Sequence, residues 1–175
     1  MRNELWIIGE LLHVCASFSI LIYSHNNSKD VGKVNGTPIQ LKHVTEIRDG
    51  ARKEIVVIEA NGLYYLKGDA TYVTFEEMYE GETIKNVVKI ANDEVVVLRS
   101  GAISMRHTFR KQSETIGTYE SPMARWEMKT KTEQVLYQYN EKAKKGKLFF
   151  SYILHLSGKH VGRHAVTMSF KEAKK

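Results

Sequence analysis

The stretch EIVVIEANGLYYLKGDATYVTF, residues 54–75, places short runs of apolar and β-branched side chains between glycine-containing pairs. β-branched and aromatic residues favour strands, and side chains on a strand alternate between two faces. Asn61-Gly62 and Gly68-Asp69 are typical of tight hairpin turns. The stretch therefore predicts three consecutive antiparallel strands, namely Glu54–Glu59, Leu63–Lys67 and Thr71–Phe75.

The same pattern extends over Thr37–Lys171. Before the opening stretch, a first strand places its apolar residues together with His43 and Thr45 on one face, and Asp49-Gly50 predicts its turn. After it, we expect the acidic segment Glu76–Glu82 to form a loop or rim. Many strands, few prolines and a barrel-sized chain favour an all-β fold, a closed or nearly closed antiparallel barrel of about 8–10 strands.

The later strands follow the same rules. Glu94–Ser100 is apolar on both faces, which predicts a central strand with Val95, Val96, Val97 and Leu98 mostly buried. Gly101 breaks or bulges the chain. The further expected elements are strands at Thr83–Ala91, Ala102–Arg110 and Thr115–Glu120, one long strand or two joined by a bend at Trp126–Tyr139, a turn at Lys144–Lys147 around Gly146, and strands at Leu148–Leu156 and Arg163–Lys171.

Composition is that of a globular domain. The chain has 175 residues, of which 42% are hydrophobic and 26% charged, and this excludes a disordered protein. One domain is expected at this length. The single cysteine, Cys15, cannot form an internal disulfide, so the chain fits a reducing compartment and we expect a cytoplasmic location.

The net charge of +6 is unevenly spread. Residues 34–98 carry 7 basic and 11 acidic side chains, whereas residues 99–175 carry 16 basic and 6 acidic ones. A basic half is typical either of a solvated charged surface or of a protein with an anionic partner, such as nucleic acid or an acidic protein. Lys142, Lys144, Lys145 and Lys147 fall in a predicted hairpin loop, where lysines are readily solvated.

The N-terminal segment is open to three interpretations. Leu5–Tyr23 is a mostly apolar run that could just span a bilayer, which would make it a membrane anchor, but Glu10 and His13 lie inside it. It could also be a packed helix. The third interpretation, which we favour, is a mis-set start, with the natural protein beginning at Val34. We therefore expect an extension over residues 1–33 and a single barrel domain over residues 34–175.

Several stretches, in the same order and spacing, resemble the YwiB-like family of bacterial proteins. They are GLYYLKGDATYVTFEE at 62–77, VVKI at 87–90, EVVVLRSGAISMRHTF at 94–109, TYESP at 118–122, MKTKT at 128–132, GKLFFSYIL at 146–154 and HAVTMSF at 164–170. The resemblance covers about residues 37–171 and implies a calycin-like (lipocalin-like) β-barrel. The family begins just before Thr37, which favours the mis-set start. It implies no function, because the family has none assigned.

Five polar residues are candidates for ligand binding. Arg99 and Arg106 lie on adjacent predicted strands, and two arginines at a barrel interior could bind a carboxylate or phosphate. If they point inward, they need a resident carboxylate, a bound anion or trapped water. Thr130 and Thr132 alternate with apolar residues and could line a cavity, and His164 shares a face with Val166 and Met168. Alternatively, the arginines lie outside and the threonines simply suit strands.

The sequence shows no catalytic constellation, no metal site among the histidines at 43, 107, 155, 160 and 164, and no cofactor motif. Three hypotheses follow. The first is a non-enzymatic barrel that binds a small anionic or amphipathic ligand. The second is an interaction module that docks nucleic acid or an acidic protein through its basic C-terminal half, and the third is an enzyme. A membrane partner is expected only if Leu5–Tyr23 is an anchor. An open cavity with inward arginines favours the first hypothesis, and a filled barrel with a basic face favours the second.

Overall fold

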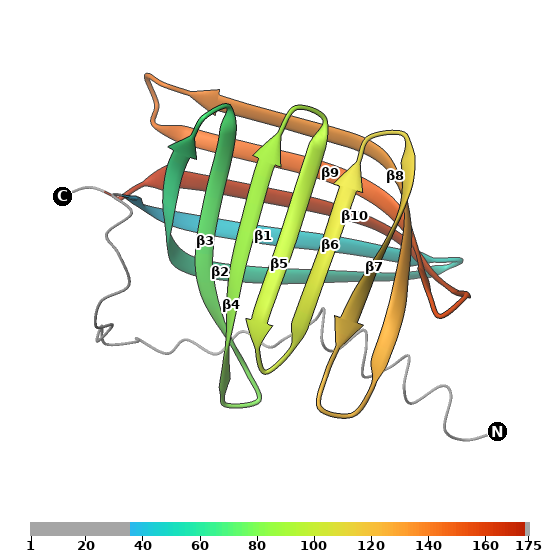
Figure 1. The fold of residues 1–175 in the computed structure, drawn as a ribbon. Helices are drawn as coiled ribbons and strands as arrows, with labels where there is room; N and C mark the ends of the chain where they lie inside the picture. Colours follow the sequence, from blue (N-terminus) through green and yellow to red (C-terminus); the bar gives the residue numbers. More distant parts are fainter. Residues whose placement is uncertain (1–35, 174–175) are drawn as a thin grey trace.

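The computed structural model describes residues 36–173, which form ten β-strands (Figure 1). The expectations for residues 1–33 lie outside these described residues. Between residues 36 and 173 there is no helix with the length and apolarity of a membrane span. The strands are β1 (Thr37–Asp49), β2 (Arg52–Lys67), β3 (Ala70–Tyr79), β4 (Glu82–Ala91), β5 (Glu94–Gly101), β6 (Ser104–Arg110), β7 (Ser113–Glu120), β8 (Arg125–Asn140), β9 (Lys145–Leu156) and β10 (Lys159–Glu172).

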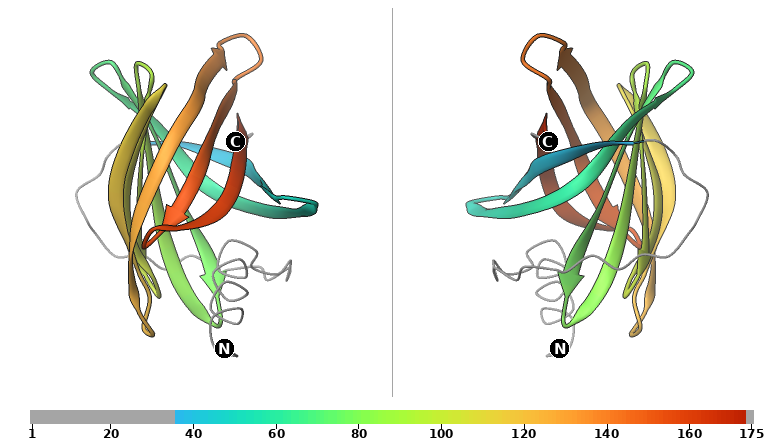
Figure 2. Two further views of the ribbon diagram at one scale, coloured as in Figure 1. Left: turned by 90° about the vertical axis from the view of Figure 1, so that its right-hand side faces the viewer. Right: turned by 90° about the vertical axis from the view of Figure 1, so that its left-hand side faces the viewer.

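The ten strands form one closed antiparallel barrel, which confirms the predicted fold class. Each strand pairs with its neighbours in the sequence, and β1 closes the circle by pairing with both β2 and β10. In Figure 1, β3 to β7 cross steeply in front of β1, β9 and β10. Figure 2 shows these two groups of strands from the side. Closure gives every strand a hydrogen-bonded neighbour on each side, but some pairings are partial, and β2 pairs with β3 only over Gly62–Lys67.

Most hairpin signals were correct, but Asn61-Gly62 does not mark a turn. Gly50 and Gly68 have positive φ angles at the expected hairpins, and so does Asn92 between the strands expected at Thr83–Ala91 and Glu94–Ser100. Asn61-Gly62, in contrast, lies within the continuous strand β2. Gly62 is needed there for a close approach, because a Cβ atom would lie 2.3 Å from the carbonyl oxygen of Thr74 on β3. The pair thus reflects tight packing of two strands rather than a turn.

Two further boundaries differ from the prediction. Residues 76–79 continue β3 instead of forming an acidic loop, and only Glu80 and Gly81 form the turn to β4. The turn before β9 is at residues 141–144, so Gly146 lies inside the strand. The region predicted as one long strand or two is one strand, β8, with a register shift between Thr132 and Gln134.

Of the four residues Val95 to Leu98, which were predicted to be mostly buried, only Val95 is fully buried. Val95 is inaccessible to solvent, whereas Val96, Val97 and Leu98 are each only half-buried. In a closed barrel every strand has two neighbours, so apolar residues on both faces do not mark a central strand. Val96 and Leu98 belong to the outer face, opposite the face that carries Val95.

The core fills the inner face of the barrel. Buried hydrophobic side chains come from all ten strands, from Ile39 and Leu41 on β1 to Met168 and Phe170 on β10. Aromatic rings contribute heavily, and Phe109 contacts the rings of both Phe150 and Tyr152. Burial of this apolar surface is the main force that stabilises the barrel.

We expect Val95→Asp to lower the free energy of unfolding by about 3 kcal/mol or more, because it places an unpaired charge in the core. Val96→Asp is the matched control on the outer face of the same strand and should cost less than about 1 kcal/mol. Urea unfolding measures both. Equal losses in the two variants would show that the inner and outer faces of β5 are assigned wrongly.

Candidate functional site

Arg99 lies on the inner face of β5 and is paired there with a carboxylate. Its guanidinium contacts Glu77 Oε1 through Nη2 and donates from Nε to Asn86 Oδ1 at 3.1 Å. Asn86 Nδ2 in turn donates to Glu77 Oε1 at 3.3 Å. The side chains of Arg99 and Glu77 are 13% and 8% exposed. The arginine thus has a resident carboxylate, one of the three partners that an inward arginine needs.

His43 on β1 faces this cluster of Arg99, Glu77 and Asn86. Burial lowers the pKa of His43 to about 4. The negative charge of Glu77 acts to raise this pKa, and the positive charge of Arg99 acts to lower it further. The imidazole is therefore neutral at pH 7. Its Nδ1 is sealed from solvent and has no hydrogen-bond partner within residues 36–173.

Thr130 belongs to a second buried cluster, with His107 and Thr115. His107 Nε2 lies 2.6 Å from Thr130 Oγ1, and Thr115 Oγ1 lies 3.1 Å from the same oxygen. Thr115 donates its own hydroxyl to the carbonyl of Thr108. The His107 ring packs over Gly117, where a Cβ atom would lie 2.3 Å from Nδ1. Thr130 therefore uses its hydroxyl within the protein and does not present it to a cavity.

Thr132 and His164 also lie on the inner face, on either side of Tyr152. The His164 ring stacks flat on the Tyr152 ring, with centroids 5.1 Å apart. Thr132 and His164 are each only 1% exposed. Burial lowers the pKa of His164 to about 4, partly opposed by the carbonyl of Gly162. Thr132 Oγ1 is buried without a hydrogen-bond partner in the described part of the chain.

The expected placement of Arg106 beside Arg99 is wrong. Arg99 pairs across the strands with Met105, so the next residue, Arg106, is opposite Leu98 and shares its outward face. Arg106 is exposed, whereas His107 beside it is buried. No hydrogen bond or ion pair within residues 36–173 joins Arg99 to Thr130, Thr132 or His164. The structure therefore places four of the five candidates on the inner face but divides them among separate clusters.

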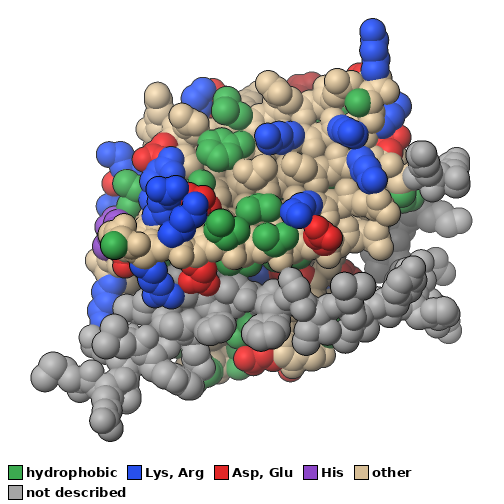
Figure 3. Space-filling view, turned by 180° about the vertical axis from the view of Figure 1, so that it is seen from behind, with side chains coloured by type: hydrophobic (Ala, Val, Ile, Leu, Met, Phe, Trp, Pro, Cys, Tyr) green, Lys and Arg blue, Asp and Glu red, His purple; other side chains and the backbone are tan. Residues whose placement is uncertain are grey.

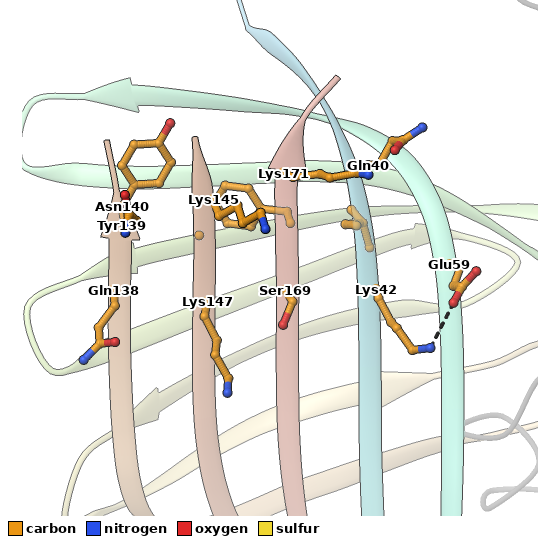
Figure 4. Close-up of a pocket in the computed structure, with 13 residues that line it drawn as sticks. Gln40, Lys42, Glu59, Gln138, Tyr139, Asn140, Lys145, Lys147, Ser169 and Lys171 are labelled. Carbon is orange, nitrogen blue, oxygen red and sulfur yellow. Dashed lines mark ion pairs between the residues drawn. The ribbon is translucent and has the colours of Figure 1, made fainter. Parts of the chain in front are cut away.

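A second polar site lies on the outside of the barrel and was missed by sequence reasoning. The outer face of β8, β9, β10, β1 and β2 is hollowed by an open groove of about 1060 Å³. We call it the lysine groove. Two rows of cross-strand neighbours line it, Asn140–Lys145–Lys171–Gln40 and Gln138–Lys147–Ser169–Lys42–Glu59 (Figure 4). Figure 3 shows the rear of the molecule, where basic side chains lie beside hydrophobic ones.

Three of these lysines have no opposite charge to bind. Lys42 forms an ion pair with Glu59 at 3.0 Å, and among residues 36–173 Glu59 is the only carboxylate that lines the groove. Lys145, Lys147 and Lys171 are exposed and form no ion pair within the part of the chain described by the structure. Lys145 and Lys147 belong to the cluster that the sequence placed in a loop. Their alternate spacing is the signal that could have assigned them to one face of a strand.

The histidines and carboxylates of the barrel do not form a metal centre. Within residues 36–173, no three His, Cys, Asp or Glu side chains lie close enough together to hold a metal ion. His155 and His160 contact each other edge to face, and His160 lies 4.0 Å from Asp49, but no third ligand joins them.

The family model of a domain of unknown function, DUF1934, matches residues 39–168, most of the chain and nearly all of the barrel. The chain belongs to the DUF1934 family. Its sequence is similar to that of the uncharacterised β-barrel protein YwiB of Bacillus subtilis (strain 168), with 29% identity over 135 residues. That alignment covers 77% of this chain and 94% of YwiB.

The fold of this DUF1934 protein is also similar to the crystal structure of the ywiB protein from Bacillus subtilis. The TM-score is 0.70 at 29% identity, and the match covers 79% of this chain and 93% of that one. The two comparisons confirm the resemblance to the YwiB-like family. Neither relative has a described function, so any function must be inferred from the site itself.

The buried histidines predict how stability depends on pH. Burial lowers the pKa of both His107 and His164 from 6.5 to about 4, so the folded protein resists protonation that the unfolded chain accepts. As the pH falls from 6.5 towards 4, the unfolded state gains protons first and the free energy of unfolding decreases. Protonation at each histidine lowers the free energy of unfolding by on the order of 3 kcal/mol once the pH is below 4.

Urea unfolding at pH 7.5, 6.5 and 5 checks this prediction, because most carboxylates titrate only below pH 5. The double variant His107→Gln/His164→Gln should reduce the dependence between pH 6.5 and 5 without abolishing it, because burial lowers the pKa of His43 to about 4 as well. The exposed-site control His160→Gln should not reduce it. A free energy of unfolding that is constant from pH 7.5 to 5 in the unmodified protein would contradict the prediction.

Proposed function

We propose that this protein is a non-enzymatic binding protein that takes an anionic partner in the lysine groove on the outside of the barrel. The observation that carries the proposal is that Lys145, Lys147 and Lys171 surround one groove in which the only carboxylate from residues 36–173, Glu59, is already paired with Lys42. Three neighbouring ammonium groups repel one another, and an anion that lies among them relieves the repulsion.

The packing of the interior supports the same proposal. The inner face is occupied by a core that draws on all ten strands, and the inward Arg99 is already neutralised by Glu77. A buried arginine that has a resident carboxylate gains little from an added anion. Of the two binding hypotheses from the sequence, a filled barrel with a basic outer face favours the interaction module.

A small-ligand site in the interior is the second candidate function. Three sealed polar atoms favour it, namely His43 Nδ1, His107 Nδ1 and Thr132 Oγ1, because each lacks a hydrogen-bond partner within residues 36–173. Buried polar groups are normally satisfied by protein, water or ligand. On this proposal, Thr132 and His164 line the binding space, Arg99 and Thr130 must exchange their present partners to reach it, and Arg106 takes no part in it.

Heparin is a suitable probe of the first proposal because it is a polyanion. We expect the triple variant Lys145→Glu/Lys147→Glu/Lys171→Glu to bind heparin about tenfold more weakly than the unmodified chain, since each exposed ion pair contributes on the order of 0.5 kcal/mol. The matched control reverses Lys67, Lys85 and Lys131, which are exposed elsewhere on the barrel.

Both triple variants have the same net charge, so a difference between them reports the site and not the overall charge. Isothermal titration calorimetry at fixed salt measures the affinity, and circular dichroism verifies folding. Equal weakening in the two variants would show that heparin responds only to net charge, and the proposed site would be wrong.

A further inference from the structure

The residue types that line the lysine groove indicate which class of anion it can recognise. The inference drawn below rests on the proposed function, namely that this groove binds an anion. Among the described residues, the cations that line the groove are all lysines, and no arginine lines it. Arginine presents a planar fork of donors that suits phosphate and nucleic acid, whereas lysine is a point charge on a flexible stem. The groove thus lacks the side chain that recognises phosphate groups most specifically.

The aromatic side chains at the groove are not available to stack on bases. Tyr139 is stacked on Tyr64, with centroids 5.1 Å apart, and its hydroxyl donates to Glu172 at 2.7 Å. Phe170 is 3% exposed and packs over Gly146. Proteins that bind single-stranded nucleic acid usually stack bases on exposed aromatic rings. Both rings that line the groove are occupied by the protein itself.

The shape of the groove favours a chain-like occupant over a membrane. Five neighbouring strands at about 4.8 Å spacing give a surface roughly 19 Å wide. The surface is hollowed by about 1060 Å³, whereas a bilayer presents a nearly flat surface on this scale. Figure 4 shows the lysine and amide side chains rising from adjacent strands around the hollow. An elongated segment can contact both rows at once.

The spacing of the charges matches an extended polypeptide. Lys145 and Lys147 lie two residues apart on one face of β9, which separates their Cα atoms by about 6.6 Å, and Lys171 lies directly opposite Lys145 on β10. Acidic side chains at alternate positions of an extended segment have the same repeat. The amides of Gln40 and Gln138 can both donate to and accept from a peptide backbone.

We infer that the lysine groove binds an acidic polypeptide segment in an extended conformation, with carboxylates at alternate positions facing Lys145, Lys147 and Lys171. Because β9, β10 and β1 are hydrogen-bonded to a neighbouring strand on both sides at the groove, a segment that lies over the groove lysines cannot add to a free edge of these strands. Recognition is therefore made by side chains, and it depends on the lysines rather than on backbone pairing.

The test uses the full chain and four probes at one salt concentration. They are a 12-residue peptide of alternating Asp and Ser, the same peptide with Asn for Asp, a 12-nucleotide single-stranded DNA, and phosphatidylglycerol vesicles. We expect the acidic peptide to bind more tightly than the DNA or the vesicles, and the Asn peptide not to bind. Reversal of the three groove lysines should weaken peptide binding at least tenfold, while reversal of Lys67, Lys85 and Lys131 leaves it within twofold.

The outcomes separate this inference from the proposed function. If DNA or vesicles bind more tightly than the peptide, in a manner that depends on the groove lysines, the acidic-segment inference is overturned and the anion-binding groove stands. The same holds if heparin binds at the groove and the peptide does not. If peptide and heparin binding are equally weakened in both triple variants, both proposals fall. Should the Glu variant not fold, Lys145→Gln/Lys147→Gln/Lys171→Gln provides the same comparison when it is paired with Lys67→Gln/Lys85→Gln/Lys131→Gln.

Discussion

Closure of the barrel through β1 is the constraint on which the rest of this structure depends. β1 pairs with β2 over Thr37–Asp49 and with β10 over Ile39–Arg48, so each of the ten strands has two partners. Once the sheet is closed, alternate side chains must point either to the interior or to solvent. Charged groups on the inner face then need internal partners, whereas those on the outer face do not.

This alternation between inner and outer faces explains why the basic residues of the barrel fall into two groups, one buried and one exposed. Arg99 points inward and is held by Glu77 and Asn86, as the high cost of burying a lone charge requires. Lys145, Lys147 and Lys171 point outward, where water solvates them and no carboxylate is needed. Their exposed ammonium groups are available to a partner, whereas the buried guanidinium is already bound. The proposed division between a structural interior and a binding exterior rests on this contrast.

The fold could be predicted from the sequence because its signals are local. Alternating strands and turn glycines such as Gly50 and Gly68 specify short-range structure directly. Asn61-Gly62 was wrongly predicted to form a turn, because a glycine required for close packing of β2 on β3 cannot be distinguished in the sequence from a turn glycine. Residues 76–79 misled because an acidic segment suggests a loop, although Glu77 faces inward to meet Arg99, 22 positions later in the chain.

The site was harder to predict because it depends on register between distant strands. Lys145 and Lys171 become neighbours only through the pairing of β9 with β10, and Lys42 lies near them only because β1 closes the barrel. A shift of one residue would turn these side chains to the other face. For the same reason, the sequence could not show that Arg99 and Arg106 lie on opposite faces.

Native mass spectrometry of the freshly purified full chain tests most directly whether the interior is completed by the protein's own side chains. The account predicts the mass of the chain alone, with no small molecule retained. The result that would contradict it is a molecule of defined mass, bound one to one by the unmodified protein and lost in a folded Arg99→Met/Glu77→Met variant. That result would place the binding site inside the barrel.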